Sequence, residues 1–340
     1  MKILHICDGW ETTNGAANIA RLIAGEQASA GHEVAYRRWA NVVELRSADE
    51  VWIHCGWKPC LWWAAFCCSL VRNIRICNHR DRRPILSWVP EACYDPIRRR
   101  YHGWKKTLVG PIERWVLRRC DRIAATCTAE AEWVRTYLGI DRLRDCSDGS
   151  GIGRRPEIVV TDIKRFFRIE GKERREAMDA SRPLHLLYLG RHHPLKGLEY
   201  LEQAVAAVNR ALDQSGQSPN TPIPAQSNNP NNRTIAFRAV SNAFGAEKEK
   251  VWAWCDVLAL PTLSDNFGLV VAEALERGKT VITTDGAPAW EPKSMSDGEE
   301  IGSDYGGRLL YLRGYRDGDA TTRIRLLKAA VLKCFPASLT

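Results

Sequence analysis

This sequence of 340 residues lacks the features that mark membrane-spanning and exported proteins. It contains no uninterrupted run of about 18 apolar residues, so no helix is expected to cross a bilayer. Its opening stretch, MKILHICDG, reaches the charged Asp8 too soon to act as a signal peptide. The sequence therefore predicts a cytoplasmic protein.

The spacing of the cysteines lacks the pattern of a metal site. No two of the twelve cysteines are separated by two residues, although paired ligands at short spacing are usual in structural zinc sites. Cys67 and Cys68 are adjacent within an apolar stretch. We therefore expect reduced and mostly buried thiols, with neither a disulfide framework nor a bound metal.

Signatures of two further classes of protein are also missing. No G-x-G-x-x-G motif follows the first apolar run, which argues against a dinucleotide-dependent dehydrogenase. No known nucleic-acid-binding motif is present, so we expect no nucleic-acid partner. The net charge of +9 nevertheless predicts a polyanionic partner, and nucleotide diphosphates and anionic lipids both meet that description.

The apolar runs alternate with segments of helical periodicity. Residues 2–6 form an expected strand, residues 16–28 a helix and residues 34–38 a second strand, which is the opening unit of a Rossmann-like domain. The alternation dissolves around residues 143–153 and restarts at the expected strand 185–189. The sequence thus predicts an α/β protein of two Rossmann-like domains in series.

We place the domain boundary between residues 155 and 156, so the domains are 1–155 and 156–340. Ligands of such sheets bind beyond the carboxyl ends of the strands, and we expect the two domains to face a cleft. The amphipathic helix expected at 321–333 would close the second domain. Residues 213–232 are rich in Asn, Pro, Ser and Gln, and they predict a flexible surface loop.

A candidate anion site begins where the expected strand ends at Pro261. A polar loop follows, and a helix is expected to begin at Phe267-Gly268. The first N–H groups of a helix have no acceptor within it, so they can bind an anion. Asp265 precedes this helix, and Glu273 comes eight residues later on its second turn. A carboxylate in that place can accept hydrogen bonds from vicinal hydroxyls. Taken alone, however, such a pair is more often a helix cap and a solvated side chain.

A second candidate segment precedes it by about 70 residues and supplies positive charge. An expected strand ends at Gly190, and Arg191 and Lys196 follow before the next helix. Two fixed cations can neutralise a pyrophosphate and stabilise the charge that develops on a leaving group. Either one alone is more simply explained as a solvated surface side chain. Their placement at a strand end, with the Pro261 segment about 70 residues later, favours a functional role for the pair.

Together these segments resemble the family-4-type retaining glycosyltransferases of group 1, which have the GT-B fold. The resemblance rests on Pro261-Thr262, Asp265, Phe267-Gly268, Glu273-Ala274, Arg191 and Lys196-Gly197. The family most often has Glu where this chain has Asp265, which keeps the charge but retracts it by about one methylene. Gly15 stands in the loop where the family carries Gly-Gly beside the donor phosphates.

The resemblance implies transfer of a sugar from an NDP-sugar with retention and without a metal or other cofactor. It implies catalytic roles for Arg191, Lys196 and Asp265. It implies donor binding by Gly15, Gly190, Asn266, Phe267, Gly268, Leu269 and Glu273. The implied acceptor is a glycan or glycolipid in the synthesis of cell-surface polysaccharide or lipopolysaccharide. The alternative is a degenerate, non-catalytic nucleotide-sugar-binding protein of the same fold, which Asp265 and the 213–232 segment motivate.

The segment between Ile97 and Cys120, whose residues 111–120 are an expected helix, holds eight Lys or Arg residues and one acidic residue, interleaved with Tyr101, Trp104 and Trp115. This mixture suits an anionic membrane surface or a phosphorylated glycolipid, and predicts peripheral contact with the inner face of a membrane. A solvated helix face with Trp115 in the core is equally compatible with the pattern. In the earlier apolar stretch, Trp57, Trp62 and Trp63 are expected to pack within the first domain, with binding of a sugar as the alternative.

Overall fold

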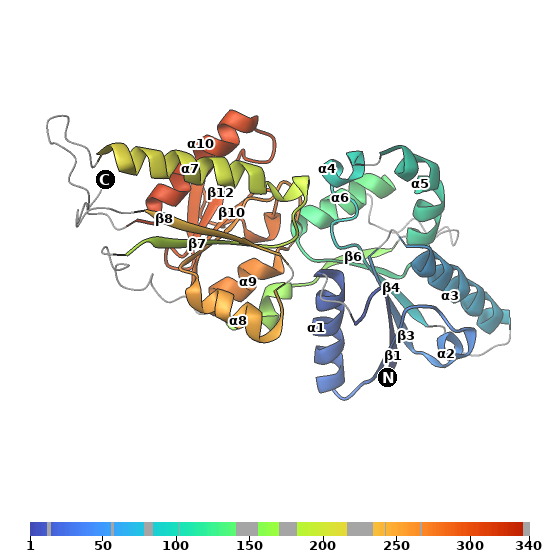
Figure 1. Ribbon diagram of the computed structural model, residues 1–340. Helices are drawn as coiled ribbons and strands as arrows, with labels where there is room; N and C mark the ends of the chain where they lie inside the picture. The colour runs from blue at the N-terminus through green and yellow to red at the C-terminus, as the bar shows by residue number, and fades with distance from the viewer. Residues whose placement is uncertain are drawn as a thin grey trace, which may run out of the picture. The chain divides into compact units, whose positions relative to one another are not determined.

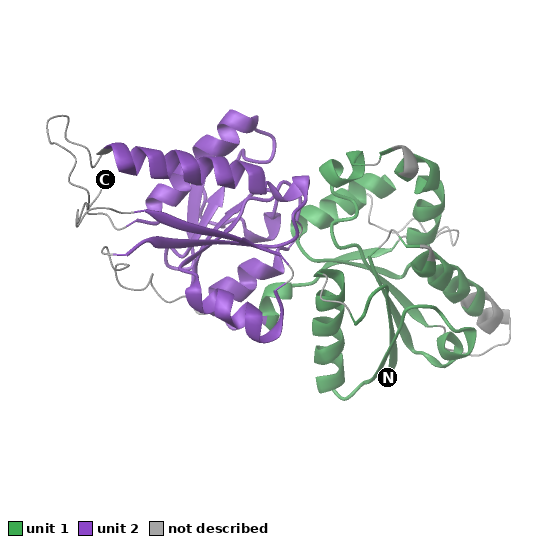
Figure 2. Ribbon diagram, viewed as in Figure 1, with its two compact units in different colours: residues 1–166 green, residues 167–340 purple. Residues whose placement is uncertain are grey.

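The computed structural model describes residues 1–11, 15–55, 58–77, 84–101, 103–140, 156–169, 182–215, 234–241, 243–265 and 267–335. The chain divides into two compact units, Met1–Phe166 and Phe167–Thr340 (Figure 2). Each unit is an α/β sandwich built on a six-stranded sheet, as the alternation of the sequence predicted. Within the described residues, no helix is both long and apolar enough to cross a bilayer.

The sheet of the first unit is parallel throughout. In spatial order its strands are β2 (Glu33–Arg37), β1 (Lys2–Cys7), β3 (Glu50–His54), β4 (Ile85–Val89), β5 (Arg122–Ala125) and β6 (Glu157–Val160). The central strands are buried along almost their whole length. This explains why their sequences are mostly apolar without alternation.

Helices cover both faces of this sheet, with α1 on one face and α2 and α3 on the other (Figure 1). They are α1 (Gly15–Ser29), α2 (Val42–Ser47), α3 (Pro59–Cys77), α4 (Pro96–Arg100), α5 (Gly103–Leu117) and α6 (Thr128–Leu138). The core between α3, α5 and the sheet includes Leu61, Cys68, Trp88 and Leu117. Of the ten cysteines whose side chains the structure describes, nine are buried, as expected, and all ten are free thiols.

The second sheet is parallel except at one edge, where β11 runs antiparallel to β12. In spatial order its strands are β11 (Ile301–Asp304), β12 (Leu309–Leu312), β10 (Thr280–Thr284), β9 (Val257–Leu260), β7 (Leu184–Leu189) and β8 (Ile235–Val240). Helices α7 (Leu198–Ser215) and α10 (Ala320–Lys333) pack together on one face (Figure 1). Helices α8 (Gly245–Trp254) and α9 (Leu269–Glu276) lie on the other face, so α10 closes the unit as expected.

Several details differ from the sequence-based expectations. Strand β6 pairs with β5, so the first unit continues to Phe166 instead of ending at residue 155. Helix α7 runs to Ser215, so residues 213–215 are helical, whereas residues 216–232 of the expected loop lie outside the described residues. Helix α5 begins at Gly103 and contains Pro111, whereas the sequence favours a helix that starts at this proline. Trp62 packs against the core as expected, Trp63 is exposed, contrary to the expected packing, and Trp57 lies outside the described residues.

Candidate functional site

The second sheet reverses its direction of winding between β7 and β9. From β7 the chain moves outward to β8, returns to β9 on the other side of β7, and continues to β10. In open α/β sheets, ligands bind beyond the carboxyl ends of the two strands that flank such a switch point. The loop after β7 carries Arg191 and Lys196, and the loop after β9 carries Asp265. The topology therefore brings both predicted segments to the place where a ligand is expected.

The loop after β7 is held in a compact turn. The hydroxyl of Tyr188 donates a hydrogen bond to the carbonyl of Arg191 at 2.8 Å, and the Leu195 N–H donates to Nδ1 of His193 at 3.1 Å. A short 3-10 turn, Pro194–Lys196, then ends at Gly197 in the left-handed conformation with φ 63°. A Cβ at Gly197 would lie only 2.1 Å from the carbonyl oxygen of Pro261, so this position requires glycine.

Backbone hydrogen bonds join this turn to the loop after β9. The Leu263 N–H donates to the carbonyl of Leu195 at 2.8 Å, and the Thr262 hydroxyl donates to the same oxygen at 3.1 Å. On the other side, the Asp265 N–H donates to the carbonyl of Gly286 at 2.7 Å. A Cβ at Gly286 would lie 2.1 Å from the Thr262 carbonyl oxygen. Three loops are therefore packed backbone to backbone, which leaves the side chains at this edge little freedom.

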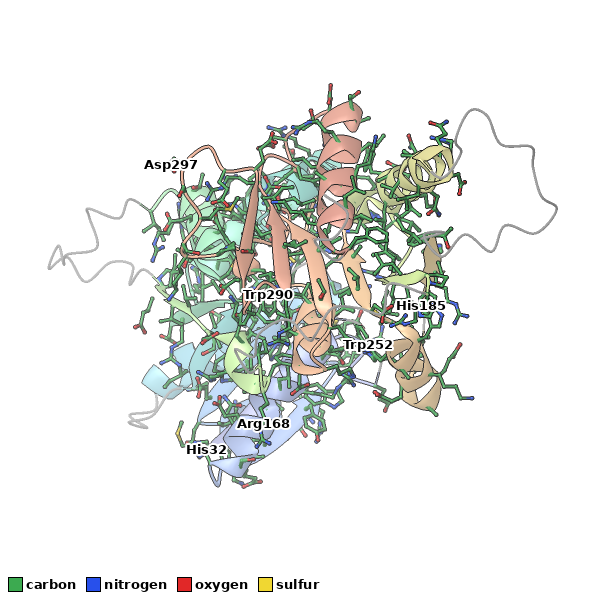
Figure 3. All side chains as sticks on the ribbon, turned by 90° about the vertical axis from the view of Figure 1, so that its left-hand side faces the viewer. His32, Arg168, His185, Trp252, Trp290 and Asp297 are labelled. Atoms are coloured by element: carbon green, nitrogen blue, oxygen red, sulfur yellow. The ribbon has the colours of Figure 1, made fainter. Side chains whose placement is uncertain are left out.

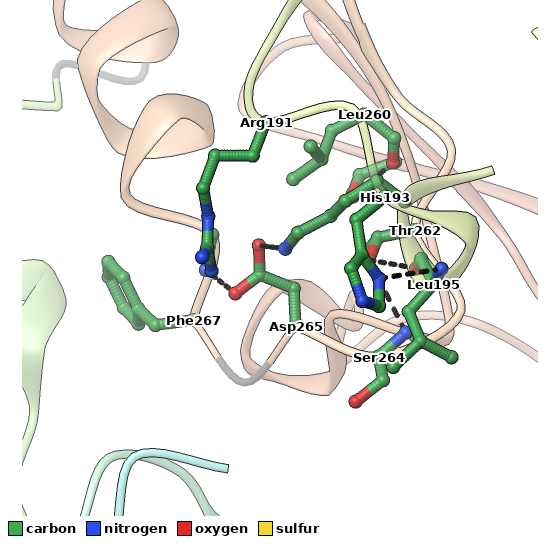
Figure 4. A network of polar contacts seen from close by, with 12 residues as sticks. Arg191, His193, Leu195, Leu260, Thr262, Ser264, Asp265 and Phe267 are labelled. Carbon is green, nitrogen blue, oxygen red and sulfur yellow. Dashed lines mark hydrogen bonds and ion pairs between the residues drawn. The ribbon is translucent and has the colours of Figure 1, made fainter. Parts of the chain in front are cut away.

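The ammonium of Lys196 contacts the Asp265 carboxylate in this packed region, so the two segments predicted from the sequence meet directly. Both side chains are partly accessible, at 15% for Lys196 and 27% for Asp265, as a ligand-binding pair must be. In Figure 4 the Arg191 side chain also points towards the Asp265 carboxylate. The other carboxylate oxygen of Asp265 accepts the Gly268 N–H at 3.3 Å.

The charges at this edge of the sheet affect the pKa of the neighbouring Tyr188. Burial raises the pKa of Tyr188 well above its usual range, and the negative charge of Asp265 raises it further, while Arg191 acts in the opposite sense. Tyr188 is therefore a neutral hydrogen-bond donor at physiological pH, which suits its bond to the Arg191 carbonyl. It positions the loop and is not itself charged.

Helix α9 begins at this site. Gly268 is its N-cap, with φ 63°, and Leu269 is its first helical residue. Phe267 is buried, and its carbonyl accepts the indole N–H of Trp290, which is labelled in Figure 3. The Phe267 side chain thus anchors the loop in the core. Its predicted role in donor binding would have to come from its backbone.

Glu273 lies on the second turn of α9, as expected, but its surroundings were not foreseen. Its Oε2 atom lies 2.6 Å from the ammonium of Lys248 on α8. No local motif connects these residues, because α8 and α9 are separated by β9 in the sequence. Only the packing of successive helices on one face of the sheet brings them together, so sequence reasoning missed Lys248.

The remaining predicted residues are distributed as follows. Gly190 continues the ladder between β7 and β8 through its N–H, which donates to the Val240 carbonyl at 3.0 Å. Gly15 begins α1 in the first unit, after a loop in which Asp8 pairs with Arg38 at 2.7 Å. Asn266 lies outside the described residues. Within those residues, no group of three His, Cys, Asp or Glu side chains is arranged to hold a metal ion.

Comparison with known families adds to this geometry. Residues 183–301 match the family described as "Glycosyl transferases group 1". The matched range is about a third of the chain, and it contains β7, β9, α9 and all three loops of the site. No curated protein sequence shows a significant match.

Solved structures with the same fold extend over nearly the whole chain. Anabaena Alr3699/HepE in complex with UDP-glucose is 13% identical, with a TM-score of 0.51 over 98% of this chain and 94% of that chain. Sucrose-phosphate synthase from Thermosynechococcus elongatus is 13% identical, with a TM-score of 0.53 over 98% and 90%. An α,α-trehalose-phosphate synthase (UDP-forming) from Burkholderia vietnamiensis is 11% identical, with a TM-score of 0.52 over 97% and 90%. The predicted GT-B fold is confirmed.

Proposed function

We propose that this protein is a retaining glycosyltransferase that moves a sugar from an NDP-sugar to a glycan or glycolipid acceptor. The observation that carries the proposal is the contact of Lys196 with Asp265 at the switch point of the second sheet. The match of residues 183–301 to group 1 glycosyl transferases supports it, because that range contains both residues. We further propose that the reaction uses no metal.

In the proposed reaction, the chain's cations stabilise the leaving group. Arg191 and Lys196 would bind the diphosphate, whose negative charge grows as the bond to the anomeric carbon breaks. Lys196 would exchange its contact with Asp265 for one with a phosphate oxygen. The carboxylate released in this way would accept hydrogen bonds from the donor-sugar hydroxyls. Because no covalent intermediate is invoked, catalysis here is positioning and charge stabilisation.

The nucleoside half of the donor would lie along α9. The N–H of Leu269, at the start of this helix, lacks an intrahelical acceptor and can donate to a phosphate. Glu273, held by Lys248, would accept hydrogen bonds from the two ribose hydroxyls. The structural relatives named above include one bound to UDP-glucose and one described as UDP-forming, which supports a nucleotide-sugar as donor.

For the acceptor and the pathway, we propose a glycan or glycolipid in cell-surface polysaccharide or lipopolysaccharide synthesis, at the inner face of a membrane. The support for this is the basic and aromatic character of residues 97–120 in the first unit. An assay with lipid-linked and soluble acceptors from the same pathway would distinguish the two acceptor classes.

The central test is NDP release by Lys196→Ala and Asp265→Asn, after a donor has been identified by thermal shift. We expect kcat to fall by about 100-fold or more in each variant, because both act on charge that develops in the transition state. Lys293→Ala, an exposed cation elsewhere in the second unit, is the matched control and should retain the wild-type rate. Wild-type rates in both site variants would refute the assignment.

The stereochemical part of the proposal needs a separate measurement. The anomeric configuration of the product, read by NMR before mutarotation, should equal that of the donor sugar. A product of opposite anomeric configuration would contradict the proposed retaining mechanism but not the proposed glycosyl transfer. A donor that stabilises the protein but gives no NDP release with any acceptor would favour the non-catalytic binding protein instead.

A further inference from the structure

Helix α5 buries a carboxylate and exposes several large apolar side chains. Glu113 is fully buried, and its two carboxylate oxygens accept hydrogen bonds from Tyr94 at 3.0 Å and Tyr137 at 2.7 Å. On the opposite side, Leu108, Ile112 and Trp115 are between 41% and 70% exposed. Their spacing of four and three residues places them on one face of the helix. An outward apolar stripe is unusual for a surface helix and marks a contact surface.

Helix α3 exposes a second apolar stripe. It packs against α5 and exposes Trp63, Phe66 and Leu70, each at nearly half of its full accessibility. These residues are also three and four apart, and the rings of Trp63 and Phe66 lie 6.0 Å apart. The side of α3 that faces the sheet is also apolar and packs in the core. The exposed apolar side chains are therefore additional to those that the core needs. We call the six exposed side chains the α3–α5 apolar face.

Positive charge borders this face. Arg100 at the end of α4, Arg114 on α5 and Arg119 just after it are exposed. The guanidinium of Arg119 lies 3.7 Å from the centre of the Trp115 ring, which combines a cation with an aromatic ring in the outward stripe. Glu113 is the only acidic residue between Ile97 and Cys120, and it is buried. The charges that α4 and α5 present to solvent are therefore positive.

We propose that the α3–α5 apolar face docks on an anionic lipid bilayer. Leu, Ile, Phe and Trp side chains can enter the boundary between headgroups and acyl chains, while long arginine side chains reach the phosphates. Docking on a bilayer is favourable because it removes six large apolar side chains from water. The chemistry selects an anionic surface because the charge that α4 and α5 expose has one sign, in a chain of net charge +9.

This docking is separate from donor binding, since it uses the first unit alone. It would bring the enzyme to a surface where lipid-linked acceptors are concentrated. It also answers the question that the sequence left open, because Trp115 is exposed and does not lie in the core.

The test is flotation of the full chain with phosphatidylcholine vesicles that contain or lack phosphatidylglycerol. We expect binding to the anionic vesicles and its loss at high salt. The triple variant Arg100→Gln, Arg114→Gln, Arg119→Gln should bind about 100-fold more weakly, because each basic residue contributes roughly a factor of five. A charge-matched control, Arg210→Gln, Lys250→Gln, Lys293→Gln, removes three exposed cations of the second unit and should bind like the wild type.

The apolar contribution is tested separately. Phe66→Ser on α3, and Leu108→Ser with Ile112→Ser on α5, should each weaken vesicle binding at least tenfold. These side chains are exposed, so near-ultraviolet circular dichroism should show unchanged folding. NDP release with a soluble acceptor should also be unchanged, which separates this surface from the donor site.

Three results would overturn the proposal. The first is failure of the wild type to bind anionic vesicles at low salt. The second is that the triple arginine variant and the serine variants all bind the vesicles as well as the wild type does. The third is self-association: if sedimentation shows a dimer of the wild type and a monomer of the Leu108→Ser, Ile112→Ser variant, a second copy covers the face in place of lipid.

Discussion

The ammonium of Lys248, on α8, lies 2.6 Å from the Glu273 carboxylate, on α9. Both side chains are partly buried, at 27% and 20% exposure, so water screens this pair less than it would at the surface. The contact fixes the direction of the carboxylate that we propose for the donor ribose. Lys248 thus acts through Glu273, as a residue that positions it.

A double-mutant cycle tests this relationship. Lys248→Met and Glu273→Gln, alone and together, should reveal a coupling free energy of about 1 kcal/mol in urea unfolding. In the functional assay, Lys248→Met should raise KM for the donor with little change in kcat, because ribose contacts are made equally in ground and transition states. Lys250→Met, on the same helix and exposed, is the control. Additive effects of the two site substitutions would show that the contact is incidental.

The length of the acidic side chain at position 265 should influence the choice of donor. Asp265→Glu extends the carboxylate by about one methylene towards the space that the sugar would occupy. We expect the ratio of kcat/KM values between two NDP-hexoses to change by roughly 10-fold, while NDP itself binds with nearly the wild-type affinity. Competition between paired donors measures that ratio. An unchanged preference would place the sugar away from Asp265.

Backbone packing between the loops after β7 and β9 should be intolerant of a single methyl group. Gly197→Ala places a Cβ 2.1 Å from the Pro261 carbonyl oxygen, at a residue with φ 63°. We expect the free energy of unfolding to fall by about 2–4 kcal/mol, from strain and displacement of the loop.

Gly25→Ala is the matched control for this substitution. Gly25 lies inside α1, and nothing lies within 4 Å of the place that an alanine methyl group would take. Since alanine favours helix, this variant should be more stable by about 0.5–1 kcal/mol. Urea denaturation followed by circular dichroism compares the two variants. Equal effects in both would mean that the close approach at Gly197 relaxes at little cost.

The stability of the second unit should depend on pH through Asp256. Burial by itself would raise the pKa of this carboxyl, but two hydrogen bonds from Arg182, both at 2.7 Å, and one from the His185 N–H outweigh burial and lower it. With a lowered pKa, the ionised carboxylate stabilises the fold above its unfolded-state pKa. That contribution is lost as the pH falls through the folded-state pKa.

Asp256→Asn should therefore cost about 1 kcal/mol of unfolding free energy near neutral pH, a modest value because Arg182 is 41% exposed. The difference from the wild type should shrink towards zero as the pH falls from neutral through the lowered folded-state pKa, where the wild-type carboxyl takes up its proton. Urea midpoints measured across this range provide the comparison. A difference that stays constant with pH would mean that shape, and not charge, explains the effect.

Local patterns in the sequence predict most of the strands and helices. Buried parallel strands such as β3 and β9 are largely apolar along their length, and they stand out from the polar loops around them. The pattern does not predict α3 as a helix, because its apolar residues lie on both its buried and exposed sides. The sequence pattern also predicts a helix that begins only at Pro111, because proline is favoured in the first turn of a helix. In the structure, α5 begins at Gly103, and tertiary packing overrides the preference of the proline.

The sequence by itself determined the α/β alternation and the residue types at the strand ends. These included Arg191 and Lys196 after one strand and Asp265 after another, because such features depend on neighbouring residues. Only the tertiary structure decided that Lys196 meets Asp265, since that contact depends on β7 and β9 being adjacent in the sheet. It also decided that Lys248 holds Glu273 and that α5 turns Trp115 outward and Glu113 inward. These relationships join segments distant in sequence, and packing, not local propensity, selects them.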